Sequence, residues 1–246
     1  MSPREREIVN VEDRLIVALN QPTVEEAITL VGTLGSVVSF YKVGLQLQMM
    51  PRIGDLIGHL LRSGKRVFLD YKYYDTVETV GDATERAARL GVTFLTVHGN
   101  RDIIRAAVEA RAGTGLKILA VTVLTSLDAA DLEDMFGRPV PVADLVLHRA
   151  AKALEYGCDG VVASIQEAKA IHGLAQGRAL AIVTPGVRLD GAGLDDHKRA
   201  GTPQAAITAG ASYLVVGRPI INAADPVRAA GDFIAAMRAA FAAHTQ

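Results

Sequence analysis

The sequence has one cysteine, no tryptophan and no long apolar run. Cys158 alone cannot form an internal disulfide, and it cannot build a zinc or iron–sulfur site that needs several cysteines. No stretch approaches the roughly 18 uncharged apolar residues of a membrane-spanning helix. The charged N-terminal segment, MSPREREIVNVEDR, lacks the apolar part of a signal peptide. We therefore expect a cytoplasmic protein that has no membrane partner.

The chain also lacks an excess of charge of either sign. Its 246 residues include 26 Lys and Arg and 27 Asp and Glu, which gives a formal net charge of -1. Proteins that bind nucleic-acid backbones concentrate positive charge, and no segment of this chain does so. A chain of this length can bury a large core. The composition predicts one globular domain over residues 1–246 and no nucleic-acid partner.

Short apolar segments rich in β-branched residues alternate with longer amphipathic segments. Such apolar runs are typical of parallel strands that helices cover. We predict strands at 15–19, 39–44, 66–72, 94–98, 117–124, 160–164, 179–183 and 213–216. Helices are expected at 23–34, 51–61, 77–90, 101–112, 143–156 and 226–241, several of them ended by glycines at positions 64, 91, 157 and 210. The longest irregular segment, 126–141, is a candidate lid.

Eight strand–helix units indicate the fold class. About 250 residues with eight such units are typical of an α/β TIM (β/α)8 barrel, whereas a doubly wound sheet usually has five or six strands. We therefore predict a barrel that forms a single domain. In such a barrel the functional residues lie at the C-terminal ends of the strands and in the loops that follow.

The predicted third strand, FLDYKYYD, places Asp70 and Lys72 on one face. Because charged side chains are rarely buried unpaired, this inward acid and base form either a site of chemistry or a structural ion pair. Asp75 either joins them or caps the next helix, since Asp75 and Glu78 have the capping-box spacing. Lys42, near the end of the second strand, either faces the same site or extends to solvent.

The loops after the seventh and eighth strands are candidates for a phosphate site, as in other TIM barrels. The seventh strand leads into VTPGVRLDGAGLDDHKR, whose backbone N–H groups could bind an anion. The eighth ends in YLVVGRPI, where Gly217 permits close backbone approach. Arg218 has a planar set of donors that suits phosphate oxygens, although it could also be a surface arginine. His98 ends the predicted fourth strand, and it is either a functional residue or a histidine packed in the core.

The segments LIVAL, YKVG, FLDYKYYD, TVHG, AVTVLTSLD, VTPGVR and LVVGRPI, in this order, resemble the orotidine 5'-monophosphate decarboxylase family. The strongest element is the D-x-K-x-x-D pattern at Asp70, Lys72 and Asp75, with Lys42 upstream and the GRP triplet at 217–219. The resemblance implies decarboxylation of orotidine 5'-monophosphate to uridine 5'-monophosphate, the last step of de novo pyrimidine synthesis. It also implies that the reaction needs no metal and no organic cofactor.

The same resemblance implies a role for each site residue. Lys72 would donate a proton to C6 of the pyrimidine within a charge network of Lys42, Asp70 and Asp75. Asp75 would reach in from the partner subunit of a homodimer, and Thr79 would contact the ribose across the same interface. The other substrate-binding residues would be Ser126 at the pyrimidine edge, Arg218 at the phosphate, and Asn20, Pro185, Arg188, His197 and Gly217.

Three positions depart from the family pattern. Asn20 stands where an aspartate is usual, Thr76 where a branched apolar residue is usual, and His197 where a glutamine is common. Asparagine keeps the shape of aspartate but removes its charge, so we expect Lys42 to be less well oriented. Two alternatives stay open. One is a magnesium-dependent sugar-phosphate decarboxylase or aldolase of the same superfamily, which has an acid in place of Lys42. The other is a non-catalytic nucleotide binder, which Asn20 favours.

Overall fold

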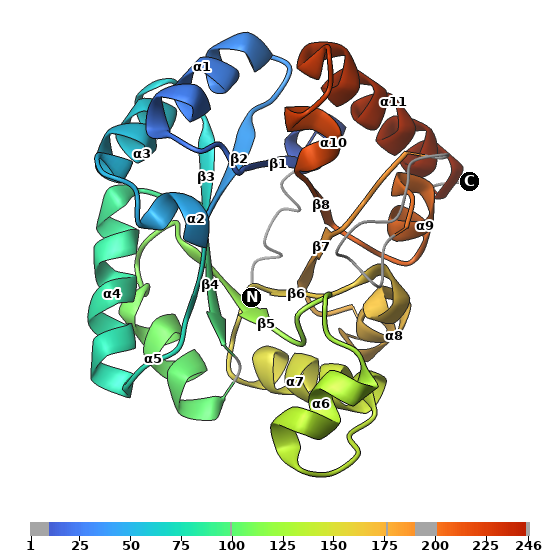
Figure 1. Cartoon of the computed structure of the whole chain (residues 1–246). Coiled ribbons are helices and arrows are strands. Elements are labelled where there is room, and N and C mark those ends of the chain that lie inside the picture. The colour runs from blue at the N-terminus through green and yellow to red at the C-terminus, as the bar shows by residue number, and fades with distance from the viewer. Residues whose placement is uncertain (1–9, 99, 176, 190–200, 245–246) are drawn as a thin grey trace.

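The computed structural model describes residues 10–98, 100–175, 177–189 and 201–244 (Figure 1). Eight parallel strands pair in sequence order and close into a barrel, which confirms the predicted TIM barrel. The strands are β1 (Leu15–Leu19), β2 (Phe40–Gly44), β3 (Arg66–Tyr73), β4 (Phe94–His98), β5 (Lys117–Val121), β6 (Gly160–Val162), β7 (Ala181–Pro185) and β8 (Tyr213–Val216).

Helices surround the barrel in the order of the chain (Figure 1). They are η1 (Val11–Arg14), α1 (Val24–Leu34), α2 (Leu45–Gln48), α3 (Ile53–Arg62), α4 (Val77–Leu90), α5 (Arg101–Ala110), α6 (Ala129–Phe136), α7 (Val142–Glu155), α8 (Ile165–Ala175), α9 (Pro203–Thr208), α10 (Arg218–Ile221) and α11 (Pro226–His244). Within the described ranges, no helix has the length and apolar character needed to cross a bilayer.

Local sequence signals fix where several helices begin and end. The Thr23 side chain accepts a hydrogen bond from the backbone N–H of Glu26 at the start of α1, and Asn100 does the same for Ile103 in α5. Gly91 ends α4 with a φ of 81°, a left-handed conformation that few other residues adopt readily. The other three glycines predicted at helix ends, Gly64, Gly157 and Gly210, also have positive φ.

The interior of the barrel is filled by a layer of aromatic rings. Phe40, Phe94 and Tyr213 lie with ring centroids 5.1 to 6.1 Å apart, and Phe68 packs against Phe94. These rings belong to the apolar cluster inside the barrel, and a second and larger cluster fills the space between strands and helices. Because side chains alternate along a strand, the next inward positions lie closer to the C-terminal mouth of the barrel.

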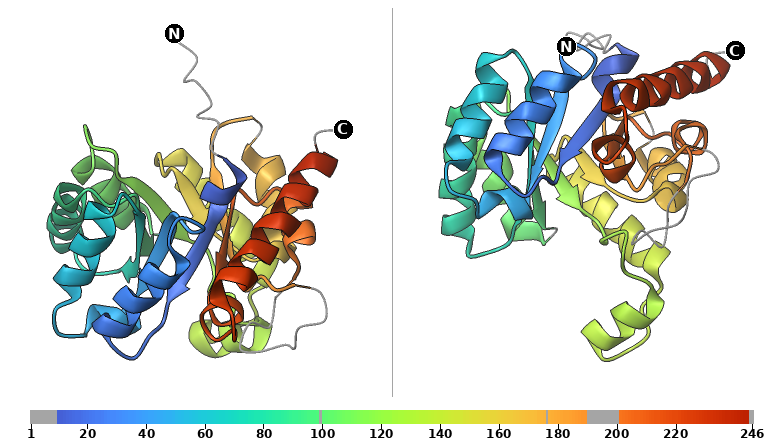
Figure 2. Two further views of the ribbon diagram at one scale, coloured as in Figure 1. Left: turned by 90° about the horizontal axis from the view of Figure 1, so that it is seen from above. Right: turned by 45° about the horizontal axis from the view of Figure 1, so that its top comes forward.

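The segment 126–141 differs from the prediction, because it contains α6 and is not irregular throughout. Asp128 caps this helix in a capping box with Asp131. Leu132 is the buried residue of its eight, so the sequence shows too little apolar periodicity to reveal a helix. Figure 2 shows α6 projecting away from the barrel. Five strands also differ from their predicted bounds by one to three residues: β2 begins at Phe40, β3 ends at Tyr73, β5 ends at Val121, β6 ends at Val162 and β7 spans 181–185.

Candidate active site

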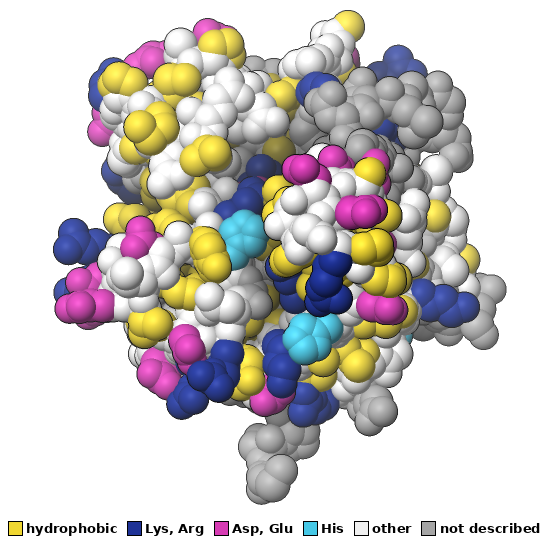
Figure 3. Space-filling view, turned by 60° about the horizontal axis from the view of Figure 1, so that its bottom comes forward, with side chains coloured by type: hydrophobic (Ala, Val, Ile, Leu, Met, Phe, Trp, Pro, Cys, Tyr) yellow, Lys and Arg dark blue, Asp and Glu magenta, His cyan; other side chains and the backbone are white. Residues whose placement is uncertain are grey.

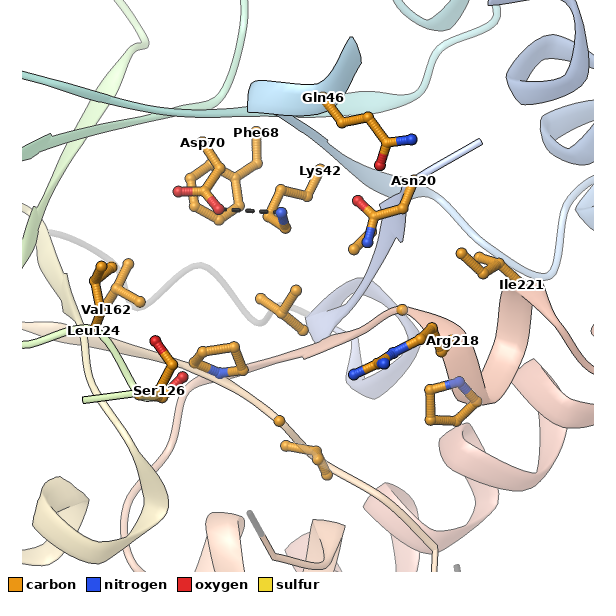
Figure 4. A pocket seen from close by; sticks show the side chains of 18 of the residues that line it. Asn20, Lys42, Gln46, Phe68, Asp70, Leu124, Ser126, Val162, Arg218 and Ile221 are labelled. Carbon is orange, nitrogen blue, oxygen red and sulfur yellow. Dashed lines mark ion pairs between the residues drawn. The ribbon is translucent and has the colours of Figure 1, made fainter. Parts of the chain in front are cut away.

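A cavity of about 630 Å³ opens at the C-terminal ends of the strands (Figure 4). This is the end at which a TIM barrel carries its functional residues. Most of the residues predicted from the sequence as site residues line the cavity: Asn20, Lys42, Asp70, Lys72, Ser126, Pro185, Arg188, Gly217 and Arg218. The fold therefore brings together residues that lie nearly 200 positions apart in the chain.

Asp70 lies between two lysines on one wall of the cavity. Its Oδ2 is 3.1 Å from Nζ of Lys42, and its Oδ1 is 2.9 Å from Nζ of Lys72. Figure 4 marks the first of these ion pairs. Burial would raise the pKa of the Asp70 carboxyl, but the charges of Lys42 and Lys72 and their hydrogen bonds lower it below its ordinary value. The carboxylate therefore stays ionised at neutral pH and holds both ammonium groups in place.

The backbone of β3 is irregular where it carries Lys72. Leu69 pairs with Leu95 of β4, but the next pair is Tyr73 with Val97, so extra residues of β3 bulge out of the ladder. Lys72 has a φ of 52°, in the left-handed region that non-glycine residues rarely adopt. The predicted common direction of Asp70 and Lys72 is confirmed, since both line the cavity. It arises from a bulge and not from the simple alternation of a regular strand.

The opposite side of the cavity has the residues suited to a phosphate. Arg218 is the first residue of α10, directly after Gly217, and its side chain points into the cavity (Figure 4). Arg188 also lines the cavity and is only 7% exposed. A Cβ at Gly217 would lie 3.7 Å from Nδ2 of Asn20, so the amide of Asn20 lies against the end of β8. This part of the cavity therefore has two arginine side chains and the backbone at Gly217, all of which are suited to phosphate oxygens.

Two of the predicted site residues that the structure describes, Asp75 and Thr79, do not line this cavity. Asp75 and Thr79 are exposed at the start of α4. Asp75 does not cap that helix, because the cap is Thr76, whose hydroxyl accepts a hydrogen bond from the backbone N–H of Thr79. The carboxylate of Asp75 instead accepts a 2.6 Å hydrogen bond from the backbone N–H of Thr76. His197 lies outside the described residues.

Several polar residues near the site have no predicted role in the sequence analysis. Gln46, Thr125 and Asn222 line the cavity. Gln46 comes two residues after the end of β2, and Asn222 follows α10, the short helix after β8. Only these positions after barrel strands could have identified them from the sequence. Thr96 lies behind the cavity on β4, and its hydroxyl donates a 3.1 Å hydrogen bond to Oδ1 of Asp70. Thr96 comes two residues after Phe94, whose ring lies inside the barrel. The alternation of side chains along β4 could therefore have predicted that Thr96 also points inward.

His98, the other sequence candidate, is half-buried at the end of β4. Its ring meets the exposed Tyr74 ring edge to face, with centroids 5.8 Å apart. Burial, together with the nearby charges of Arg149 and Lys72, lowers the pKa of the His98 imidazole. It does not line the cavity. Among the described residues, no group of three or more His, Cys, Asp and Glu side chains is arranged to hold a metal ion.

Comparisons with known proteins point in one direction. The model of the orotidine 5'-phosphate decarboxylase / HUMPS family matches residues 13–233. The orotidine 5'-phosphate decarboxylase of Afipia carboxidovorans is 50% identical to this chain over 229 residues, which are 92% of this chain and 95% of that protein. The enzyme of the same name from Methylococcus capsulatus is 49% identical over 236 residues, 96% of each chain.

A solved structure also resembles this fold. The crystal structure of orotidine 5'-phosphate decarboxylase from Lactobacillus acidophilus matches with a TM-score of 0.78 and 34% sequence identity. The match covers 91% of this chain and 98% of that one. The range that the family model matches, 13–233, includes every residue that lines the cavity.

Proposed function

This chain belongs to the orotidine 5'-phosphate decarboxylase / HUMPS family, and we propose that it is a carboxy-lyase that converts orotidine 5'-monophosphate to uridine 5'-monophosphate in de novo pyrimidine synthesis. The observation that carries the proposal is the array of Lys42, Asp70 and Lys72 on one wall of the cavity. On the other side are arginines suited to the substrate's phosphate. The cavity thus offers an ammonium group to the pyrimidine end of a nucleotide and arginines to its phosphate end.

Lys72 supplies the charge that this reaction needs. When the bond between C6 and the carboxylate breaks, carbon dioxide leaves and the electron pair stays on C6. An ammonium beside C6 stabilises this transition state more than the ground state. Unit charges about 4 Å apart interact by about 4 kcal/mol at an effective dielectric near 20, which corresponds to roughly three decades in rate. Lys72 then transfers a proton to C6, and solvent protonates its amine again.

Asp70 keeps the ammonium group where the reaction requires it. Its side chain is 13% exposed, and it pairs with both lysines at once. A charge that is already oriented needs no rearrangement at the moment of bond cleavage. The aromatic layer beneath excludes water from that side, so these charges are screened less than at a surface.

The remaining stabilisation comes from parts of the substrate that do not react. We assign the phosphate to Arg218, together with Arg188 and the backbone near Gly217 and Pro185, and we keep His197 as a candidate in the same region. Ser126 is assigned to the pyrimidine edge and Asn20 to the ribose. Binding energy from these groups holds C6 against Lys72 and displaces water from the cavity.

The active form that we propose is a homodimer, in which Asp75 and Thr79 of each subunit complete the site of the other. Both residues are exposed at the start of α4. Large apolar side chains are exposed beside them, Tyr74 at 66% and Val77 at 50%, and hydrophobic side chains also reach the surface in the view of Figure 3. Light scattering at micromolar concentration tests this: a strict monomer with full activity would leave Asp75 without this role.

The decisive experiment is a turnover assay on the purified chain. Loss of the orotate absorbance with added orotidine 5'-monophosphate, and formation of the uridine nucleotide, would establish the activity. Turnover that disappears in EDTA would favour the magnesium-dependent alternative. Tight nucleotide binding without any turnover would favour a non-catalytic binder.

A further inference from the structure

Thr96 joins the two charged residues that the proposed reaction uses. It lies in β4, is completely buried and does not line the cavity. Its hydroxyl donates a 3.1 Å hydrogen bond to Oδ1 of Asp70 and accepts a 2.9 Å hydrogen bond from the backbone N–H of Lys72. One side chain from the neighbouring strand therefore contacts both the carboxylate that orients the ammonium and the backbone that carries it.

The bond to the backbone matters because of the bulge in β3. Between Leu69 and Tyr73 the pairing with β4 is interrupted, and the N–H of Lys72 donates to the hydroxyl of Thr96 where a regular ladder would use a backbone carbonyl. The left-handed φ of Lys72 is unfavourable for a residue with a Cβ, and it persists only where the surroundings hold it. The hydroxyl of Thr96 replaces the missing acceptor at this point.

We propose that Thr96 is a positioning residue for decarboxylation. It holds the bulge that aims the Lys72 side chain into the cavity, and it fixes the orientation of the Asp70 carboxylate that pairs with that side chain. The proposal rests on the proposed function, because it assigns Thr96 to the same reaction without contact to the substrate. Serine at this position would keep the hydroxyl, whereas valine would keep the shape and lose both hydrogen bonds.

The test compares Thr96→Val with Thr96→Ser in the full-length protein. Thr96→Val is expected to lower kcat by about 10- to 100-fold, the effect of losing a buried hydrogen-bonded group at the site, with KM within threefold. Thr96→Ser is expected to keep kcat within about threefold of the unmodified protein. The matched control is Thr184→Val, because Thr184 in β7 is equally buried and its hydroxyl has no hydrogen-bond partner among the described residues. This control is expected to leave kcat unchanged.

A crystal structure of Thr96→Val gives a readout that does not depend on activity. The proposal expects a changed φ at Lys72 or a broken contact between Lys72 and Asp70. If the unmodified protein shows no turnover, the proposed function fails, while this structural test of Thr96 still applies. A kcat within threefold of the unmodified value together with an unchanged bulge would overturn the proposal. Should Thr96→Val not fold, Thr96→Ala removes the same hydroxyl with a smaller side chain, and the same outcomes decide.

Discussion

Inside the barrel, Phe40, Phe68 and Phe94 form one layer, and the residues two positions further along the same strands form the next. The first, which we call the lower layer, is apolar and almost completely buried. The second, the upper layer, contains Lys42 and Asp70, which are joined in an ion pair, and Lys72 pairs with Asp70 from further along β3. Both layers follow from the same alternation of side chains, but one fills the interior of the barrel and the other is the layer to which we assign the chemistry. The difference shows that a charged layer can lie directly above an apolar aromatic layer, two residues further along the same strands and closer to solvent.

The largest expected effect removes the ammonium of Lys72, which pairs with Asp70 of the upper layer. Lys72→Ala should lower kcat by at least about a thousandfold, because an ammonium near C6 accounts for roughly three decades in rate. Binding of a uridine nucleotide should stay measurable by calorimetry, since Arg218 and the other phosphate-side residues are unchanged. A kcat within tenfold of the unmodified value would remove Lys72 from the mechanism.

The lower layer should respond in the opposite way. Phe94→Ala removes a ring that packs against Phe40, Phe68 and Tyr213, so the free energy of unfolding should fall by about 3–5 kcal/mol. The kcat of the protein that remains folded should change far less than in Lys72→Ala. Chemical denaturation measures the first quantity and steady-state kinetics the second.

The matched control for Phe94→Ala is Met135→Ala in α6, where the side chain is 61% exposed. A surface truncation of this kind should change the unfolding free energy by no more than about 0.5 kcal/mol. If Phe94→Ala destabilised the protein no more than Met135→Ala does, the aromatic layer would not stabilise the barrel as we infer.

Asp70→Asn tests the charges of the upper layer through their effect on stability. At neutral pH the change should destabilise the protein by about 3 kcal/mol, because two partly buried lysines lose their shared carboxylate. The folded pKa of Asp70 lies below its ordinary value of 3.8. Stabilisation by this carboxylate is therefore complete above 3.8 and is lost as the pH falls from there through the folded pKa. Thermal unfolding of both proteins across this range measures it, and a difference that stayed constant into strong acid would contradict the assignment.

The sequence could predict the barrel and most of the cavity, because both follow from periodic patterns. Apolar runs at regular spacing identified the strands, and the position of Asp70, Lys42 and Gly217 near strand ends identified the mouth. The bulge in β3 could not be predicted, since alternation assumes a regular strand. For the same reason the hydrogen bonds of Thr96 could not be predicted, although Thr96 lies in the predicted fourth strand.

Other parts of the site lay beyond sequence reasoning for different reasons. The helix α6 is short and has one buried residue, so its pattern is too weak to detect. The expected contribution of Asp75 depends on a second subunit, and a single chain places this residue at the surface. Periodicity describes how one chain folds, and it contains no information about which surface meets another copy.

The smallest expected effect concerns Asn20, the position where the upper layer lacks a charge. Asn20 and Lys42 line the same cavity, so Asn20→Asp would give the ammonium of Lys42 a second anionic neighbour. A partly exposed ion pair contributes about 1 kcal/mol, so we expect kcat to rise roughly fivefold. Asn222→Asp is the matched control, because it adds the same charge to the cavity beyond α10 and beside the phosphate end, where it should raise KM instead. Equal effects of the two changes on kcat and KM would show that only the total charge of the cavity matters. A gain confined to Asn20→Asp would show that the upper layer is incomplete at this one position.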